Sequence, residues 1–541
     1  MSLMPLRSSP YVSRGKRRTS ASQTHTAHMY GAPVAGIDVT QTLVAADPNT
    51  AVVLENLIPR VYGCELRKGF VRWATGLNGE VRSLMSYNAP TTTQLFACSS
   101  NGTIYDVTAQ SSGAPIPVYT HPVGDMMGEW YSINFVTAGG NYLLSVSAGE
   151  GYHIFDGATW VDVAQGTGPG QINGLDPKLF AYIFEWKGRV WFLRKDSAIA
   201  YYLPTGQITG TVVPFDFGPF LRKGGPLAVG TNWTVDGGEG IDDKLVLFSL
   251  EGDVLIYGGT DPSDANKFAK QGSYYLGHLP VARRCVSVFG TDIAILSEKG
   301  LCFLSELLRG QGFFVNAPIA QRVNSAIAQE VSAKMTQRYW ELIFLPHEQL
   351  ILVNTPTTTA VDTQWAFEVN AKAFCTLTHM PMLSTAAFDR RTFFGDGEGN
   401  VWLGFEGSSD GAVDASRGTD IEGTVVTAFL PHGEPYRTKI FHMVRPAFLA
   451  PVAPAIKVAI NPDWSFISPS GSPQFTPPPG SSLWDLAIWN QTVWNGSEKS
   501  YAAWVGVQGS GFYGALSMKV RGEPGTTFVS WQLLTTPGGV L

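Results

Sequence analysis

The sequence predicts a mainly β protein: a β-propeller of about six to eight irregular blades, with an additional C-terminal β-sandwich-like domain and an extended N-terminal segment. Seven times the chain repeats a short apolar strand, a polar or glycine-bearing turn and a second apolar strand. Successive repeats start 43 to 57 residues apart, about the length of one four-stranded blade, and a ring of blades leaves few exposed sheet edges. The repeats begin at Leu95, Leu143, Val190, Leu245, Ile293, Leu350 and Phe393.

Composition is the second observation that favours β structure. The 541 residues include 59 glycines and 34 prolines, and only 15% of the residues are charged. This balance is typical of turn-dense β structure and of surfaces buried between subunits. The formal net charge of −6 gives no overall attraction to nucleic acid, so any DNA contact would be local. No stretch approaches the roughly 20 apolar residues that span a bilayer, so membrane insertion is not expected.

The N-terminus, residues 1–30, predicts a flexible basic arm, because it carries clustered cations and no acidic residue. Such cations bind polyanions by releasing counterions, so the arm could contact DNA or an acidic partner surface. The alternative is a solvated tail that becomes ordered only on assembly. Residues 31–80 alternate short apolar runs with turn signals, which predicts an extended β segment. The candidate contact residues of the arm are Arg7, Arg14, Lys16, Arg17 and Arg18.

Residues 81–410 predict the propeller itself. Each hairpin is preceded by a further apolar run, such as VRSLMSYN at 81–88, so three or four strands are available in every repeat. One helix interrupts this pattern, since apolar residues recur every four positions between 319 and 331. We expect this helix to pack against the propeller rim, with a partner-binding role as the alternative. Its apolar face consists of Ile319, Val323, Ile327 and Val331.

Residues 411–541 predict the C-terminal β domain. Several apolar runs, among them TKIFHMVRPAFLA at 438–450 and YGALSMKVRG at 513–522, read as strands. A loop at 461–482 is rich in proline, which lacks an N–H donor and so cannot join a central sheet. Four tryptophans beyond or near this loop suit either a packed aromatic core or a subunit interface. They are Trp484, Trp489, Trp494 and Trp504.

The sequence offers no catalytic, cofactor-binding or metal-binding motif. Residues 407–411 match the G-x-S-x-G string, but a nucleophile elbow needs a helix directly after the serine, and here a polar loop follows. The nine histidines lack metal-ligand spacing. Asp396 and Gly399 form an Asp/Gly turn before an aromatic strand, for which we expect a structural role because the carboxylate can accept from turn amides. We therefore expect no enzymatic activity.

The five cysteines lack CxxC spacing, and most lie within apolar strand runs. We expect them to be small buried hydrophobic residues that form no disulfide framework. They are Cys64, Cys98, Cys285, Cys302 and Cys375.

Three segments resemble the tail nozzle (tail tubular, or tail hub) proteins of short-tailed, podovirus-like bacteriophages. Residues 51–87 are similar to the family's opening passage through Asn56, Pro59, Arg67, Gly69, Gly76 and Leu84. Residues 256–308 resemble a passage in which a G-x-D-P turn precedes a G-x-Y strand and a late Gly-Leu. The third segment is the tryptophan-rich C-terminus that ends in PGGVL. The likeness is extended and includes no catalytic string.

This resemblance implies a structural protein of the virion tail, made in the host bacterial cytoplasm. Such a subunit would form a homo-oligomeric ring, expected to be a hexamer, below the portal and its adaptor, and would dock tail fibres or spikes. Double-stranded DNA would pass through the ring without sequence-specific contact. Few cations on the bore would suit that passage, because a wall rich in lysine and arginine would hold phosphates strongly.

Two other functions fit a propeller. One is a receptor-binding or glycan-binding tail component, for instance a sialidase-like one, although the hairpins show no arginine or carboxylate repeated at matching blade positions. The other is a cellular WD40-like adaptor, which would show more regular blades and Trp-Asp at blade ends. Neither feature occurs in this sequence.

Overall fold

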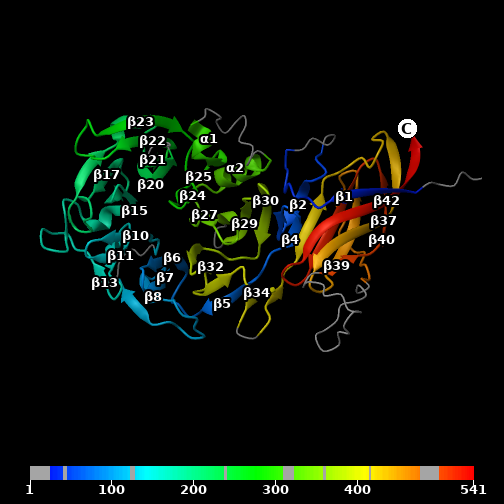
Figure 1. The fold of residues 1–541 in the computed structure, drawn as a ribbon, viewed down its shortest axis with the longest axis horizontal. Coiled ribbons are helices and arrows are strands. Elements are labelled where there is room, and N and C mark those ends of the chain that lie inside the picture. Colours follow the sequence, from blue (N-terminus) through cyan, green and yellow to red (C-terminus); the bar gives the residue numbers. More distant parts are fainter. Residues whose placement is uncertain are drawn as a thin grey trace, which may run out of the picture.

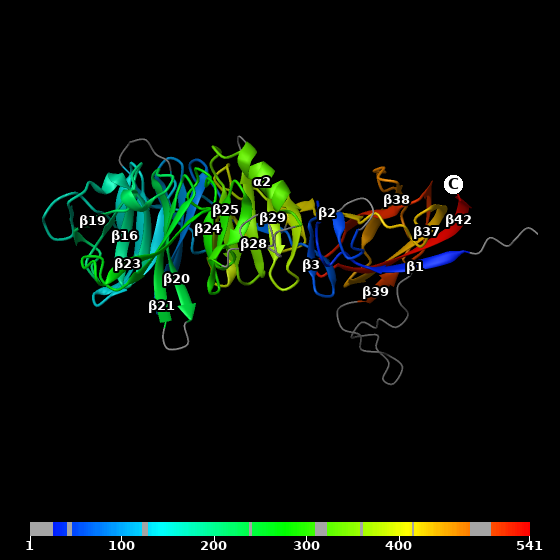
Figure 2. The same ribbon diagram turned by 90° about the horizontal axis from the view of Figure 1, so that it is seen from above.

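The chain folds into two lobes that lie side by side along the long axis of the molecule, a propeller and a β-sandwich (Figures 1 and 2). This computed structural model describes residues 25–40, 46–121, 128–236, 241–308, 322–356, 361–413, 416–475 and 499–540.

The propeller has six blades built from consecutive antiparallel strands, within the predicted range of about six to eight. The first two consist of β6 (Val81–Asn88), β7 (Thr93–Ser99), β8 (Thr103–Asp106) and β9 (Pro117–Thr120), then β10 (Tyr131–Thr137), β11 (Gly140–Ser147), β12 (Gly151–Phe155) and β13 (Trp160–Asp162). The next two consist of β15 (Phe180–Trp186), β16 (Arg189–Arg194), β17 (Ile199–Tyr202) and β19 (Val213–Asp216), then β20 (Leu227–Asp236), β21 (Ile241–Ser249), β22 (Asp253–Gly259) and β23 (Phe268–Tyr275).

The fifth blade has three strands and is followed by the two α-helices of the described chain. The sixth again has four. Their elements are β24 (Val286–Phe289), β25 (Asp292–Ser297), β26 (Gly300–Phe303), α1 (Leu304–Leu308), α2 (Asn324–Ala333), β27 (Glu341–Leu345), β28 (Leu350–Pro356), β29 (Val361–Glu368) and β30 (Ala373–Thr378). Short elements near the third blade are β14 (Ile172–Asn173), β18 (Gly210–Thr211) and the 3-10 turns Pro177–Leu179 and Gly218–Phe220.

A composite sheet closes the ring between the sixth blade and the first. Its strands β31 (Ser384–Phe388), β32 (Arg391–Gly395) and β33 (Val401–Gly404) come from the end of the propeller, but its outer strand β5 (Phe70–Ala74) precedes the first blade. Strands β31 and β32 pack against β6, and the Ser384 hydroxyl donates a hydrogen bond to the Val81 carbonyl at 2.9 Å. The two ends of the propeller are therefore joined within one sheet, which continues into β34 (Ser409–Ala412) and β35 (Thr419–Asp420).

The second lobe is a sandwich of two sheets. One contains β1 (Thr26–Gly31), β3 (Leu57–Arg60), β4 (Gly63–Leu66), β37 (Arg437–Ala450), β39 (Lys499–Ala502), β40 (Val505–Gly511) and β42 (Thr527–Val540). The other contains β36 (Gly423–Thr427), β41 (Gly514–Arg521) and β38 (Ala455–Pro462). The predicted sandwich is therefore present, and strands from the N-terminal segment complete it.

The second sandwich sheet is continuous with the sixth propeller blade. Strand β2 (Ala51–Glu55) pairs with β36 on one side and, through Glu55 and Thr376, with β30 on the other. The result is one eight-stranded sheet that runs from β27 in the propeller to β38 at the sandwich edge. The two lobes thus share backbone hydrogen bonds across their junction.

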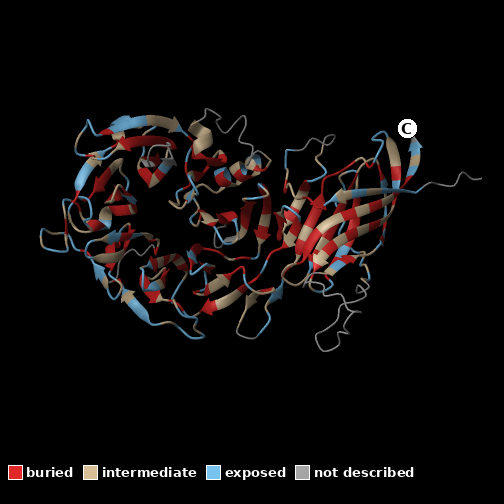
Figure 3. Ribbon diagram, viewed as in Figure 1, coloured by how far each residue is buried: buried red, intermediate tan, exposed pale blue. Residues whose placement is uncertain are grey.

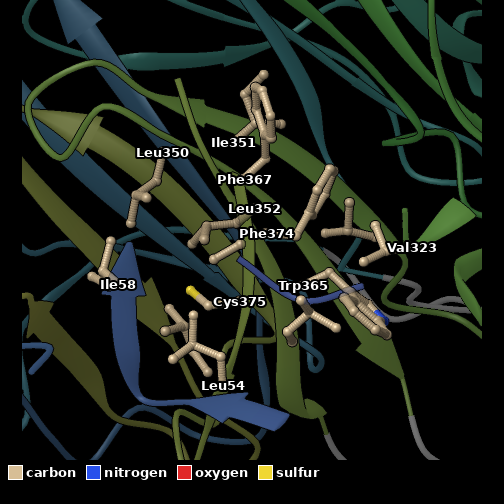
Figure 4. Packing of buried hydrophobic residues seen from close by; sticks show 14 of the residues in the cluster. Leu54, Ile58, Val323, Leu350, Ile351, Leu352, Trp365, Phe367, Phe374 and Cys375 are labelled. Carbon is tan, nitrogen blue, oxygen red and sulfur yellow. The ribbon is translucent and has the colours of Figure 1, made fainter. Parts of the chain in front are cut away.

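The largest part of the hydrophobic core also crosses the junction between the two lobes. One cluster of buried residues extends from the fourth blade through the sixth into both sandwich sheets. Figure 4 shows its centre, where Leu54 of β2 and Ile58 of β3 lie against Leu352, Phe374 and Cys375 of the sixth blade. Smaller clusters join neighbouring blades around the rest of the ring. In Figure 3 the middle strands of the blades, such as β11, β12 and β22, are mostly buried, whereas the outer strands β13 and β23 are largely exposed.

Several sequence predictions are confirmed at the level of elements. All seven predicted hairpins are present, as β7–β8, β11–β12, β16–β17, β21–β22, β25–β26, β28–β29 and β32–β33. The predicted helix is α2, with Ile327 and Val331 buried, whereas Ile319 lies outside the described residues. All five cysteines are buried and free.

Candidate functional site

The propeller axis encloses a cavity of about 570 Å³. Every sheet of the ring contributes to its wall, through its first strand or the residues just before it, because the first strand of each sheet is the innermost. The wall includes aromatic rings, hydroxyls and charged groups: Leu84, Tyr131, Tyr182, Glu185, Thr231, Asn232, Arg284, Glu341 and Thr385. Small-molecule sites have volumes of about 300 to 1,000 Å³. The volume of this cavity falls in that range, whereas its exposed lining is more polar than is usual for such a site.

Arg284, two residues before β24, links the fifth blade to the first two. Its Nη1 donates to the Arg82 carbonyl at 2.9 Å, and its Nη2 donates to Ser83 Oγ at 2.6 Å and to the Trp130 carbonyl at 3.3 Å. The guanidinium also lies 5.7 Å from the centre of the Tyr131 ring. One side chain therefore holds three blades at the axis.

The neighbouring Arg283 points to the fourth blade. Its Nη1 donates to the carbonyls of Leu227 and Ala228, both at 2.8 Å, where β20 begins. The two adjacent arginines thus bind carbonyls in different blades, because each planar guanidinium can donate several hydrogen bonds at once. They form a double-arginine hub, consisting of Arg283 and Arg284.

The carboxylate of Glu341 lies next to Arg284 of the hub and opposes its positive charge. Its Oε1 lies 3.7 Å from Nη1 of Arg284, and its Oε2 accepts a hydrogen bond from Asn354 Nδ2 at 3.0 Å. Burial raises the pKa of Glu341, and the positive charge of Arg284 opposes that shift. Burial also raises the pKa of Tyr131 to about 12. The tyrosine is therefore a neutral hydrogen-bonding group at neutral pH.

The axis is too small to carry double-stranded DNA. A cube of about 570 Å³ has an edge of about 8 Å, less than the roughly 12 Å of the major groove alone. If DNA passes this protein, the channel must be formed between several copies.

A second, larger cavity of about 1080 Å³ lies between the propeller and the sandwich. Its wall contains six carboxylates, and the most buried ionic contact beside it joins Arg67 to Asp410 through two bonds of 2.7 and 2.6 Å. Glu422 accepts from Lys519 and Arg521. The Arg67–Asp410 contact joins the sandwich to the propeller, whereas the contacts of Glu422 lie within the sandwich. The six are Glu55, Asp396, Glu398, Asp410, Asp420 and Glu422.

The two motifs from the sequence have structural roles here. Asp396 Oδ1 accepts from the backbone N–H groups of Glu398 and Asn400, each at 2.8 Å, which confirms the predicted turn. Ser409 of the G-x-S-x-G string is buried in β34, and its Oγ accepts from the Gly418 N–H at 3.0 Å. No histidine contacts this hydroxyl among the interactions of the described residues, so it lacks the base that a nucleophile needs.

The residues predicted to contact DNA or partners are mostly outside the described part of the chain. This holds for Arg7, Arg14, Lys16, Arg17, Arg18, Trp484, Trp489 and Trp494. Trp504 is described, between β39 and β40, and 40% of it is exposed. It therefore belongs to the surface of the sandwich in this single chain.

Sequence reasoning missed the double-arginine hub. The available signal was the pair Arg283-Arg284 directly before an apolar strand in a chain with few charges, since a buried arginine must find acceptors. In the described ranges, no three histidine, cysteine, aspartate or glutamate side chains are placed to hold a metal ion. None of the helices described is long and apolar enough to cross a membrane.

Comparison with known proteins identifies no family. No protein-family model matches the chain, and no curated protein matches it. Among solved structures, the computationally designed Ika8 protein is similar over 63% of this chain and 100% of its own, with 8% sequence identity and a TM-score of 0.33.

Proposed function

We propose that this chain is a structural subunit of a phage tail nozzle, a ring that extends the DNA-ejection channel below the portal and adaptor and docks fibres or spikes. The proposal starts from the resemblance of residues 51–87, of residues 256–308 and of the C-terminus to that family. It assigns the chain no reaction. Its partners would be further copies of itself, the adaptor, and fibre or spike proteins.

The eight-stranded sheet across the junction is the observation that carries this proposal. A channel subunit under load must keep its lobes in fixed relation, and lobes joined only by side chains move more readily than lobes joined by backbone hydrogen bonds. Strand β2 supplies such bonds, and the buried Arg67–Asp410 pair adds a second connection. The arrangement favours a rigid building block over a hinged enzyme.

The narrow propeller axis bears on where the DNA channel would lie. Since a duplex exceeds the axial cavity of one chain, the ring must place its bore between subunits. A net charge of −6 per chain is compatible with a bore that does not retain phosphates.

Electron microscopy of the purified protein, alone and co-expressed with the products of the neighbouring genes, tests the assembly. We expect closed rings with a bore wide enough for a duplex. Monomers alone under both conditions would refute the proposal, as would the absence of this chain from purified virions.

The axial cavity favours one second candidate function, recognition of a receptor glycan. Hydroxyl, amide and carboxylate groups beside Tyr131 and Tyr182 offer the mixture of polar and aromatic contacts that a sugar needs. A glycan array with the wild type and with Thr231→Trp, which fills the cavity, tests this function. Sugar binding that disappears in the variant would establish it, whereas binding that is absent or unchanged would exclude the axis.

A further inference from the structure

A small pocket at the far end of the sandwich brings together two cations that have unused hydrogen-bond donors. Its volume is about 230 Å³, and it lies between β1, the start of β37 and the end of β42, away from the propeller (Figure 1). Because one water occupies about 30 Å³ of liquid, the pocket has room for several waters or for one small ion. Its wall consists of Thr26, His28, His432, Gly433, Glu434, Arg437, Lys439, Thr535 and Pro537.

The pocket forms where the ladder between β37 and β42 is interrupted. The register shifts between Arg437 and Lys439, and Lys439 then faces Pro537, which has no N–H to donate. A strand pair without a bulge would close this space with backbone hydrogen bonds. The opening is therefore a property of the sequence at these positions.

Lys439 is the central group of the pocket. Only 4% of it is exposed, and the charges of Asp463 and Glu434 favour its charged form, although neither carboxylate forms an ion pair with it in the described part of the chain. Its Nζ donates to the carbonyls of Glu434 at 2.7 Å and Phe512 at 2.9 Å. An ammonium has three protons, so one donor remains for a ligand.

Arg437 adds a second unused donor. Its Nη1 lies 3.4 Å from Oε2 of Glu434, but its Nε is buried and has no hydrogen-bond partner in the described structure. The pocket wall thus carries two cations and one carboxylate, Glu434, while the charge of Asp463, which is not part of the wall, also acts on Lys439. An anion in the pocket would accept from the two N–H donors that the described contacts leave unused.

The histidines of the pocket divide into one fixed and one titratable group. Nε2 of His432 must donate to the Gly514 carbonyl at 3.0 Å, so its Nδ1 accepts from the Tyr30 hydroxyl at 2.8 Å. Burial lowers the pKa of His432 to about 3, and this ring stays neutral. Burial and the charge of Lys439 also lower the pKa of His28, whose Nε2 lies 3.2 Å from Thr535 Oγ1. An anion next to Lys439 would weaken that repulsion and let His28 accept a proton.

We propose that this pocket binds a tetrahedral oxyanion of the phosphate or sulfate class, with Lys439 and Arg437 as its cationic donors. The remaining donors, Thr26 and His28 on β1 and Thr535 on β42, surround the same space from two further strands. Donors on three strands suit a tetrahedral anion better than a planar carboxylate. The site is independent of the proposed ring, so either can fail alone.

Calorimetric titration of the full chain with sodium sulfate at pH 6 tests the site, with ionic strength held constant by sodium chloride. We expect saturable binding of one sulfate, similar binding of phosphate, and much weaker binding of acetate. Equal affinity for acetate, or no binding of sulfate by the wild type, would overturn the proposal.

Substitutions test which side chains bind the sulfate ion. We expect Lys439→Met and Arg437→Gln each to weaken sulfate binding at least about tenfold, while Lys457→Met, an exposed lysine on β38, leaves it unchanged. If Lys439→Met does not fold, Arg437→Gln decides, because Arg437 is partly exposed and its loss should be tolerated. Unchanged affinity in Arg437→Gln would then refute the site.

The pH dependence gives a readout that a purely structural lysine would not produce. Sulfate keeps its charge of −2 between pH 6 and 8, so any tighter binding at pH 6 reports proton uptake by the protein. We expect such a gain in the wild type and its loss in His28→Gln, which still binds sulfate. A gain that persists in His28→Gln would contradict the assigned role of His28.

Discussion

The second blade and the sixth blade differ in how they complete their sheets. Strands β10 to β13 pair only with one another and lie next to each other in sequence. The sheet of the sixth blade instead includes β2, which precedes β27 by more than 280 residues in the chain, and continues into the sandwich. The comparison teaches that the repeat determines each blade locally, whereas the joining of the two lobes depends on a few long-range contacts. A substitution in the second blade should therefore disturb mainly that blade, whereas one at the junction should disturb both lobes.

The largest effect is expected from the buried ion pair at the junction. Arg67 is 2% exposed and binds Asp410 through two nitrogen atoms. Arg67→Met leaves that carboxylate without its counterion, which should lower the free energy of unfolding by about 3 to 5 kcal/mol. Urea unfolding followed by tryptophan fluorescence measures the loss.

The matched control for this pair is Arg417, which forms an exposed ion pair with Asp420. Arg417→Met should cost no more than about 1 kcal/mol, because solvent screens an exposed pair. Equal losses in the two variants would mean that the junction pair contributes no more than a surface contact.

A second pair of substitutions compares how far a local change spreads from each of the two regions. Leu54 in β2 and Leu144 in β11 are both fully buried, and each change to alanine should cost about 2 to 5 kcal/mol. We expect Leu54→Ala to speed amide exchange in β30 and in β36 alike, because β2 pairs with both. Leu144→Ala should leave exchange in β36 unchanged. Identical exchange patterns would show that the whole chain opens as one unit.

A smaller effect is expected from two buried histidines, one in each lobe. Burial lowers the pKa of His153 in the second blade and of His432 in the sandwich to about 3, from the ordinary 6.5. The unfolded chain thus binds more protons between pH 6.5 and 3, and stability falls as the pH decreases through that window. Each histidine contributes up to about 1.4 kcal/mol per pH unit.

Substitution by phenylalanine separates the two contributions. His153→Phe should flatten the acid dependence of the propeller, and His432→Phe that of the sandwich, as followed by amide exchange at pH 4 to 7. The groups that face His153 are His121, Tyr119 and Asp162. An unchanged pH dependence in both variants would show that other groups cause the loss of stability at low pH.

The same contrast explains what the sequence could predict. Alternating apolar runs and turns reveal hairpins such as β11–β12, because their partners are adjacent in the chain. Nothing local in residues 51–55 or 70–74 indicates that β2 and β5 join sheets whose other strands lie hundreds of residues away. The hub was missed for a similar reason, since the acceptors of Arg284 belong to blades far from it in sequence. The Asp396 turn was predictable in more detail, because the contacts of its carboxylate all lie within six residues.

The position of β5 has a consequence for the order of folding during synthesis. This strand leaves the ribosome before any blade, but its partner β33 ends at Gly404, and the sandwich partners of β1, β2 and β4 follow later still. Strands β3 and β4 can pair with each other at once and the blades can form one after another, whereas β1, β2 and β5 must wait for partners that are made much later. A nascent chain therefore holds open edges until synthesis is nearly complete, which is the period when chaperone binding or association with another copy competes with correct closure.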